Sequence, residues 1–161
     1  MTKIGTEEAE KIIRQYSDMI YRIAVHNLGN FADAEDIMQD VCVALLTKCP
    51  GQRDPEHLKA WLIRVTINKC NSLHRLARSR RSEPLEEYTH LEAPEHREVM
   101  EELWLLPKDS RNIIYLYYYE SYTIAEIARI LGKNPNTVSS KLQRARKKLK
   151  ALLTEGEDSH D

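Results

Sequence analysis

The stretch TIAEIARILGKNPNTVSSKLQRARKKLK, residues 123–150, decides the fold of the C-terminal part of the chain. Thr123 and Glu126 form a T-x-x-E capping box, in which each side chain satisfies a free backbone amide at a helix start. Gly132 stands where a left-handed residue ends a helix at little cost. Asn134 is a favoured N-cap and Pro135 a favoured first helical residue, so a second helix begins after a short turn. Two helices joined in this way form a helix-turn-helix.

The second of these helices has an apolar face and a basic face. Its inward stripe is expected at Val138, Leu142, Ala145 and Leu149, and its outward face at Asn136, Thr137, Ser140, Lys141, Arg144, Lys147 and Lys148. Residues 132–150 hold seven Lys or Arg and no acid. Small polar side chains near the N-terminus can approach base edges, and the basic ones can neutralise phosphates, which indicates DNA binding. The alternative is a solvated basic helix that only covers a core.

The near-neutral net charge of −1 conceals strongly segregated charges along the 161 residues. Residues 61–81 hold six Lys or Arg and no acid, whereas residues 33–40 hold four acids and no base. Residues 83–102 hold eight Glu and one Arg. Such blocks say more about binding partners than about the fold. The composition, with 42% hydrophobic and 30% charged residues, is typical of a helix-rich globular protein.

Apolar residues recur at steps of three and four through most of the chain, which predicts an all-α protein. The expected helices cover residues 6–28, 33–48 with Asp33 as N-cap, 55–78, 95–105, and the buried stretch RNIIYLYYYE. Leu58, Leu62, Val65, Leu73 and Leu76 supply the predicted buried stripe of the third helix. We therefore expect two small helical domains, residues 6–78 and 95–153, joined by a flexible linker over residues 79–94, which contains two prolines.

Three segments together extend this interpretation: DAEDIMQDVCVALL at 33–46, HLKAWLIRVTINKCNSLHRLARSRR at 57–81, and LPKDSRNIIYLYYYESYTIAEIARILGKNPNTVSSKLQRARKKLK at 106–150. Over about residues 8 to 153 the chain resembles the extracytoplasmic-function (ECF) sigma factors of bacteria. The resemblance implies a subunit that binds core RNA polymerase and directs it to promoters. The first domain would correspond to sigma region 2, which reads and melts the minus-10 element. The second would correspond to region 4, which reads the minus-35 element.

The resemblance also assigns residues. Those implied to bind polymerase, at the coiled coil of its largest subunit, are Asp33, Glu35, Asp36, Gln39 and Asp40, while the flap is a second expected contact. Those implied to bind minus-10 DNA are Asp54, Asn68, Lys69, Asn71, Ser72, Arg75, Arg78, Arg80 and Arg81, with the 48–57 loop capturing an extruded base. Those implied to bind minus-35 DNA are Asn136, Thr137, Ser139, Ser140, Lys141, Arg144 and Lys148. An acidic first helical turn that merely suits the helix dipole is the alternative for the polymerase segment.

Some positions depart from the family pattern. Ser72 stands where many relatives have Asp or Asn, and Asn134-Pro135-Asn136 where Ser-Glu-Gly is common, so the promoter sequence stays open. Cys42 replaces a usual aromatic residue and is expected to be a small core residue. Trp61 is expected in the core rather than as a stacking platform.

Two other functional classes compete with the sigma interpretation. A stand-alone helix-turn-helix regulator would bind operator DNA tightly without polymerase and would not need residues 33–40. An enzyme is disfavoured, since no phosphate-binding glycine loop, nucleophile elbow or HExxH motif occurs. The spacing of cysteines and histidines predicts no metal site, and no cofactor is expected. We also expect a cytoplasmic protein without membrane insertion, a stress or envelope-response regulon, and an anti-sigma factor as a further partner.

Overall fold

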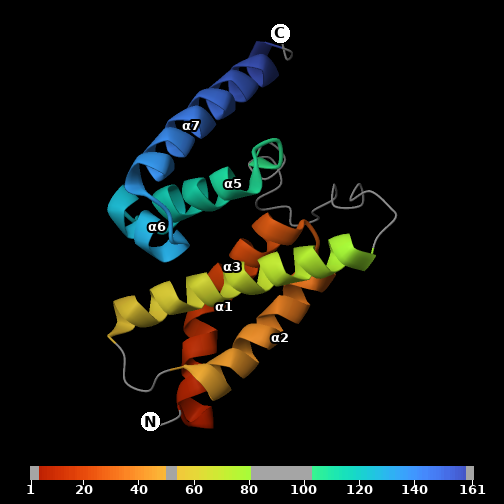
Figure 1. Cartoon of the computed structure of the whole chain (residues 1–161), viewed down its shortest axis with the longest axis vertical. Coiled ribbons are helices and arrows are strands. Elements are labelled where there is room, and N and C mark those ends of the chain that lie inside the picture. Colours follow the sequence, from red (N-terminus) through yellow and green to blue (C-terminus); the bar gives the residue numbers. More distant parts are fainter. Residues whose placement is uncertain (1–3, 50–53, 81–102, 159–161) are drawn as a thin grey trace. The chain divides into compact units, whose positions relative to one another are not determined.

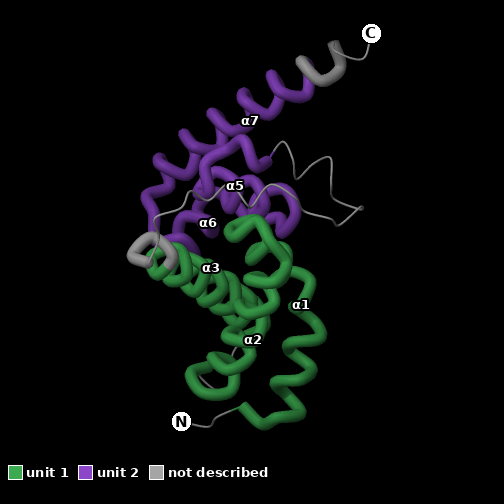
Figure 2. The backbone as a smooth tube through the Cα atoms, turned by 90° about the vertical axis from the view of Figure 1, so that its right-hand side faces the viewer, with its two compact units in different colours: residues 1–90 green, residues 91–161 purple. Residues whose placement is uncertain are grey.

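The structure, a computed structural model, describes residues 4–49, 54–80 and 103–158 (Figure 1). The chain divides into two compact units, residues 1–90 and 91–161 (Figure 2). Every element assigned within the described ranges is a helix. The predicted all-α class is therefore confirmed.

Unit 1 is built from three helices that pack on one another around a single core. They are α1 (Thr6–Leu28), α2 (Phe31–Lys48) and α3 (Pro55–Arg80), drawn from red to yellow-green in Figure 1. Each of the three contacts the other two. The largest fully buried side chains of this core are Ile20, Ile23, Val41, Leu45, Leu62 and Ile63. The core thus draws on one face of each helix, as the apolar periodicity requires.

The corner between α1 and α2 differs from the prediction. Gly29 ends α1 with φ of 80°, and its amide donates to the Val25 carbonyl. The N-cap of α2 is Asn30, since its side-chain oxygen accepts a 2.8 Å hydrogen bond from the Asp33 amide. Asp33 instead lies in the first turn and accepts a 2.8 Å bond from the Asn30 side chain. The predicted N-cap at Asp33 is wrong, because Asn30 can reach that amide three residues ahead.

The inner face of α3 is also rotated from the predicted stripe. Its buried residues are Leu62, Ile63, Thr66, Ile67 and Cys70. Leu58, Trp61, Val65 and Leu73 are half-buried, and Leu76 is 50% exposed. An α-helix turns about 100° per residue, so a residue six positions beyond Cys70 points away from the core. The expectation of Leu76 in the buried stripe is therefore wrong, and Trp61 lies at the edge of the core.

Unit 2 contains α5 (Lys108–Ile114), a five-residue π-helix η2 (Tyr115–Tyr119), α6 (Ile124–Leu131) and α7 (Pro135–Asp158). α7 packs against α5 and α6, and α6 also contacts η2. The predicted helix over RNIIYLYYYE is confirmed as α5 with η2. Of the helix expected at 95–105, residues 95–102 lie outside the described residues. The core includes Leu103, Leu106, Ile113, Leu116, Ile127, Val138 and Leu142.

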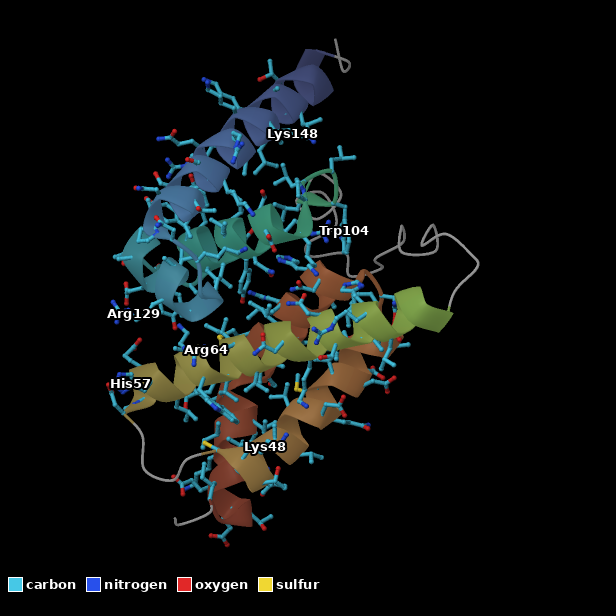
Figure 3. All side chains as sticks on the ribbon, in the orientation of Figure 1. Lys48, His57, Arg64, Trp104, Arg129 and Lys148 are labelled. Atoms are coloured by element: carbon cyan, nitrogen blue, oxygen red, sulfur yellow. The ribbon has the colours of Figure 1, made fainter. Side chains whose placement is uncertain are left out.

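A buried arginine fixes the segment that enters α5. The Arg111 guanidinium lies 3.9 Å above the Trp104 ring centroid and donates a 3.1 Å hydrogen bond to the Leu106 carbonyl. Burial lowers the pKa of Arg111 to about 10, so it stays charged at neutral pH. The contact ties Trp104 (Figure 3) to α5, and a stacked, desolvated cation of this kind stabilises the pair.

Candidate nucleic-acid and polymerase interfaces

The helix-turn-helix forms with the caps that the sequence predicts. Thr123 Oγ1 accepts from the Glu126 amide at 3.2 Å, and Glu126 Oε1 accepts from the Thr123 amide at 3.0 Å. These bonds hold the pKa of Glu126 below its usual value, chiefly through the Thr123 backbone amide. Gly132 adopts φ of 67°, and the Asn134 side chain accepts from the Asn136 amide at 2.8 Å. Four local hydrogen-bond and backbone features therefore fix the angle at which α7 leaves the turn.

α7 separates its apolar and polar faces as predicted. Val138, Leu142 and Ala145 are buried, and Leu149 is half-buried at the edge. The predicted DNA-binding residues Asn136, Thr137, Ser140, Arg144 and Lys148 are exposed, while Ser139 and Lys141 are half-buried. The structure therefore brings the small polar side chains together at the exposed start of α7 and the basic ones further along it. This is the order that major-groove readout requires.

A groove of about 610 Å³ runs between the start of α5 and the middle of α7. Its polar lining includes Lys108, Asp109, Lys141, Arg144 and Lys148. Lys148, labelled on α7 in Figure 3, donates a 3.0 Å hydrogen bond to the Leu105 carbonyl. The charged residues that line the groove are four cations and one acid, and the groove adjoins the exposed face of α7.

The single acid in this groove, Asp109, was missed by sequence reasoning. Its Oδ2 accepts hydrogen bonds from Lys141 at 3.1 Å and from Lys133 at 3.2 Å. Partial burial alone would raise the pKa of Asp109, but the hydrogen bonds and charges of Lys141 and Lys133 outweigh it and lower the pKa. Lys141, predicted as a DNA contact, is thus already paired within unit 2. No local pattern links residues 24 and 32 positions apart in the sequence, which explains the omission.

Another basic residue of α7 turns away from the exposed polar face. The Arg146 guanidinium donates to the Tyr118 hydroxyl at 2.5 Å and lies 5.1 Å and 5.4 Å from the ring centroids of Tyr117 and Tyr118. The hydrogen bond to Tyr118 is the main cause that raises the pKa of Arg146. Of the seven basic residues in 132–150, Lys133, Lys141 and Arg146 are therefore bonded to other residues of unit 2.

In unit 1, α2 presents an exposed acidic face. Ala34, Ile37, Val41, Ala44 and Leu45 point into the core. The predicted polymerase-binding residues Glu35, Asp36, Gln39 and Asp40 are exposed, and Asp33 is half-buried. Within the described residues, Asp36 and Asp40 form no salt bridge. The side chains are available to a partner, and the acidity of this face is uncompensated on α2 itself.

Two exposed apolar residues continue this face and were not predicted. Val43 is 58% exposed and Leu46 is 40% exposed. Asp36, Asp40, Val43 and Leu46 succeed one another along α2 at steps of four, three and three. This is the spacing of residues on one helical face. The helical spacing of Val43 and Leu46 is visible in the sequence, but apolar residues in a helix normally indicate positions in the core.

The predicted minus-10 residues lie along α3. Asn68, Ser72 and Arg75 are exposed at steps of four and three, and Arg75 donates a 3.1 Å bond to the Ser72 hydroxyl. Lys69 and Asn71 are half-buried on either side. Asp54 is exposed at the start of α3, where it accepts a 3.4 Å bond from the Glu56 amide. The side chains of Arg78 and Arg80, Arg81, and residues 50–53 of the predicted base-capturing loop lie outside the described residues.

The described residues also bear on three other features, a metal site, a membrane-spanning helix and a reactive thiol. No cluster of three His, Cys, Asp or Glu able to hold a metal occurs among the described residues. None of the described helices is long and apolar enough to cross a membrane. All three cysteines are free thiols, and Cys42 is half-buried rather than a core residue. Burial raises the pKa of the Cys42 thiol, which disfavours the reactive thiolate.

Known proteins share both units in the same order. The family model described as Sigma-70 region 2 matches residues 12–81, and the model described as Sigma-70, region 4 matches residues 96–149. RNA polymerase sigma factor SigV of Bacillus subtilis is 28% identical, with 88% of this chain and 89% of SigV covered. ECF RNA polymerase sigma factor SigM of Mycobacterium tuberculosis is also 28% identical, with 89% of this chain and 76% of SigM covered.

Solved structures show the same fold. The structure of CnrH in complex with the cytosolic domain of CnrY matches with a TM-score of 0.68 and 26% identity, over 94% of this chain and 90% of that one. The sigma factor RpoE in complex with the anti-sigma factor NepR, from Bartonella quintana, matches with a TM-score of 0.70 and 23% identity, over 90% and 96% of the two chains.

The matches to sigma-70 regions 2 and 4, in this order along the chain, identify a transcription-initiation protein. The chain belongs to the sigma-70 family, as an extracytoplasmic-function member with region 2 in its N-terminal unit and region 4 in its C-terminal unit.

Proposed function

We propose that this chain binds core RNA polymerase and directs it to promoters through separate contacts with the minus-10 and minus-35 elements. The observation that carries the proposal is the ordered pair of interfaces, an acidic face on α2 and an acid-free face of α7 that is polar at its start and basic further along. We assign residues 6–78 to polymerase binding and minus-10 recognition, residues 79–94 to a linker, and residues 95–153 to minus-35 recognition. The chain acts by binding and positioning, and it is not an enzyme.

The polymerase contact is assigned to Asp33, Glu35, Asp36, Gln39 and Asp40. Exposed carboxylates without salt bridges attract a basic partner and keep their full charge for it, so they speed encounter and fix register. The coiled coil of the largest polymerase subunit is the proposed partner. The flap is the proposed contact of unit 2.

Minus-10 recognition is assigned to the exposed side of α3. Asn68 offers a donor and an acceptor for a base edge, and Arg75 supplies a positive charge for the phosphates. Asp54, Lys69, Asn71, Ser72, Arg78, Arg80 and Arg81 complete the proposed set. Extruding a base costs a few kcal/mol, which contacts in a pocket can return.

Minus-35 recognition is assigned to α7. Asn136, Thr137, Ser139 and Ser140 lie within its first two turns, where side chains of a recognition helix contact base edges. Arg144, which is exposed, and Lys148 supply phosphate contacts further along the helix. Lys141 belongs to this set only when its bond to Asp109 is exchanged for DNA.

Regulation is proposed from the structural relatives. CnrH and RpoE were each solved in complex with a binding protein, and for RpoE this is an anti-sigma factor. We propose that an anti-sigma factor likewise covers the polymerase and DNA surfaces of this chain. We also propose that the protein acts in the cytoplasm. Its release from the anti-sigma factor would switch on a stress or envelope-response regulon.

The competing function is that of a stand-alone regulator, and DNA binding with and without polymerase separates the two. We expect the full-length chain to bind fragments of its source DNA weakly when alone, but tightly and at few sites together with core polymerase. Arg144→Ala should weaken the polymerase-dependent binding and reduce the slope of log K against log salt by about 0.9, the value of one phosphate contact. Lys11→Ala, an exposed lysine of α1, removes the same charge and should leave the slope unchanged. Tight operator-like binding by the chain alone, unaffected by polymerase, would favour the regulator.

A further inference from the structure

Asp109 joins three separate segments of unit 2. It lies in the first turn of α5, while its two partners come from the turn before α7 and from α7 itself. The carboxylate oxygen is 3.2 Å from Lys133 Nζ and 3.1 Å from Lys141 Nζ. The Lys133 side chain is 29% exposed, that of Lys141 is 27% exposed, and that of Asp109 is 41% exposed. Because the bridge is partly buried, dissolved salt screens its charges less than it would screen an ion pair on the open surface.

The bridge changes how many positive charges the helix-turn-helix offers to DNA. An ammonium group bonded to a carboxylate is held in place, and the adjacent negative charge weakens its attraction for a phosphate. The negative charge of Asp109 also faces the same groove as Arg144 and Lys148. Arg144, by contrast, is exposed and forms no salt bridge within the part of the chain that the structure describes.

We infer that Asp109 is a positioning residue that holds Lys133 and Lys141 away from the phosphates and so lowers sequence-independent DNA affinity. Phosphate contacts supply most non-specific affinity, whereas base contacts supply discrimination. With two lysines held back, binding depends more on the polar residues at the start of α7. The inference rests on the proposed minus-35 role of unit 2 and specifies how that surface is tuned.

A purely structural ion pair predicts something different. Removing it would change the stability of unit 2 but would leave the number of released counterions unchanged or lower. The salt dependence of DNA binding therefore separates the two roles. Asp109→Asn keeps the shape and an acceptor oxygen, while Asp109→Glu keeps the charge.

The test measures binding of the full-length chain to a random-sequence DNA duplex, by fluorescence anisotropy over a series of low salt concentrations. We expect Asp109→Asn to bind about two- to tenfold more tightly than the wild type at the lowest salt. Its slope of log K against log salt should steepen by about 1 to 2, since each released lysine adds about 0.9. Asp109→Glu should retain the wild-type slope. Asp18→Asn, an exposed acid on α1, makes the same charge change and should alter neither quantity by a comparable amount.

A second pair of variants keeps the inference testable if Asp109→Asn fails to fold. Lys133→Met should leave the wild-type slope unchanged because this lysine is held back, whereas Arg144→Ala should lower it by about 0.9. The inference is overturned if Asp109→Asn leaves the slope unchanged or shallower, if Lys133→Met lowers it as much as Arg144→Ala, or if no variant binds duplex DNA. Failure of the proposed function would be separate, since it would appear as a lack of promoter-directed transcription even where these slopes behave as expected.

Discussion

Reversing the charge of the α2 acidic face should abolish polymerase binding without unfolding unit 1. The variant is Asp36→Arg with Asp40→Arg. Both side chains are exposed and lie beyond the first helical turn, so they contribute little to the core or to the helix dipole. Exposed substitutions of this kind change stability by about 0.5 kcal/mol or less each. Circular dichroism should therefore show unchanged helix content and nearly unchanged thermal unfolding.

The effect on binding follows from replacing attraction by repulsion at two positions. A charge pair at the rim of an interface contributes about 0.2 to 1 kcal/mol, and like charges brought together cost several kcal/mol. Two reversals should thus cost about 3 to 6 kcal/mol, which is about 150-fold to 25,000-fold in Kd. The assay titrates fluorescently labelled chain with bacterial core polymerase. Glu7→Arg with Asp18→Arg, both exposed on α1, makes the same change in net charge and should bind normally. A folded double variant that retains wild-type affinity would refute the assignment of this face.

Further predictions concern the local structure of unit 2. Thr123→Ala removes the capping box and should lower its free energy of unfolding by about 1 kcal/mol, measured by urea titration with Trp104 fluorescence. Gly132→Ala should cost about 1 to 2 kcal/mol in the same assay because φ is 67°, although no neighbouring atom would contact the added methyl group. Since the Lys141 and Lys133 bonds outweigh burial and lower the pKa of Asp109 on folding, its stabilising contribution should be present above the ordinary value of 3.8. It should be lost as pH falls through the lower folded-state pKa, and Asp109→Asn should remove that part of the acid sensitivity in urea titrations at successive pH values.

Local features of the chain could be predicted, and features that depend on distant pairs could not. The capping box at Thr123, the left-handed Gly132 and the stripe from Val138 to Ala145 each arise from residues within a few positions of one another. The α2 start was misplaced because Asn30 and Asp33 are both good caps, and only the backbone shows which one reaches the free amide. Whether Leu76 faces the core depends on which side of α3 packs against the other two helices, and the sequence alone does not show this.

The candidate interfaces show the same division. The exposed acidic face of α2 follows from the helical period, because its apolar residues must face the core. The bridge of Asp109 with Lys133 and Lys141 joins segments that only folding brings together. The exposure of Val43 depends equally on the packing of neighbouring helices. Tertiary contacts therefore decide which basic residues remain available to DNA.

Promoter-directed transcription is the most direct measure of the central claim. Purified bacterial core polymerase should be assayed by run-off transcription on sheared DNA from the source of the chain, with and without the full-length protein, and the transcript starts mapped. The account predicts new starts that share upstream elements near minus-10 and minus-35, and their loss with the Asp36→Arg, Asp40→Arg double variant. An absence of new starts, together with tight binding of duplex DNA by the protein alone, would contradict it.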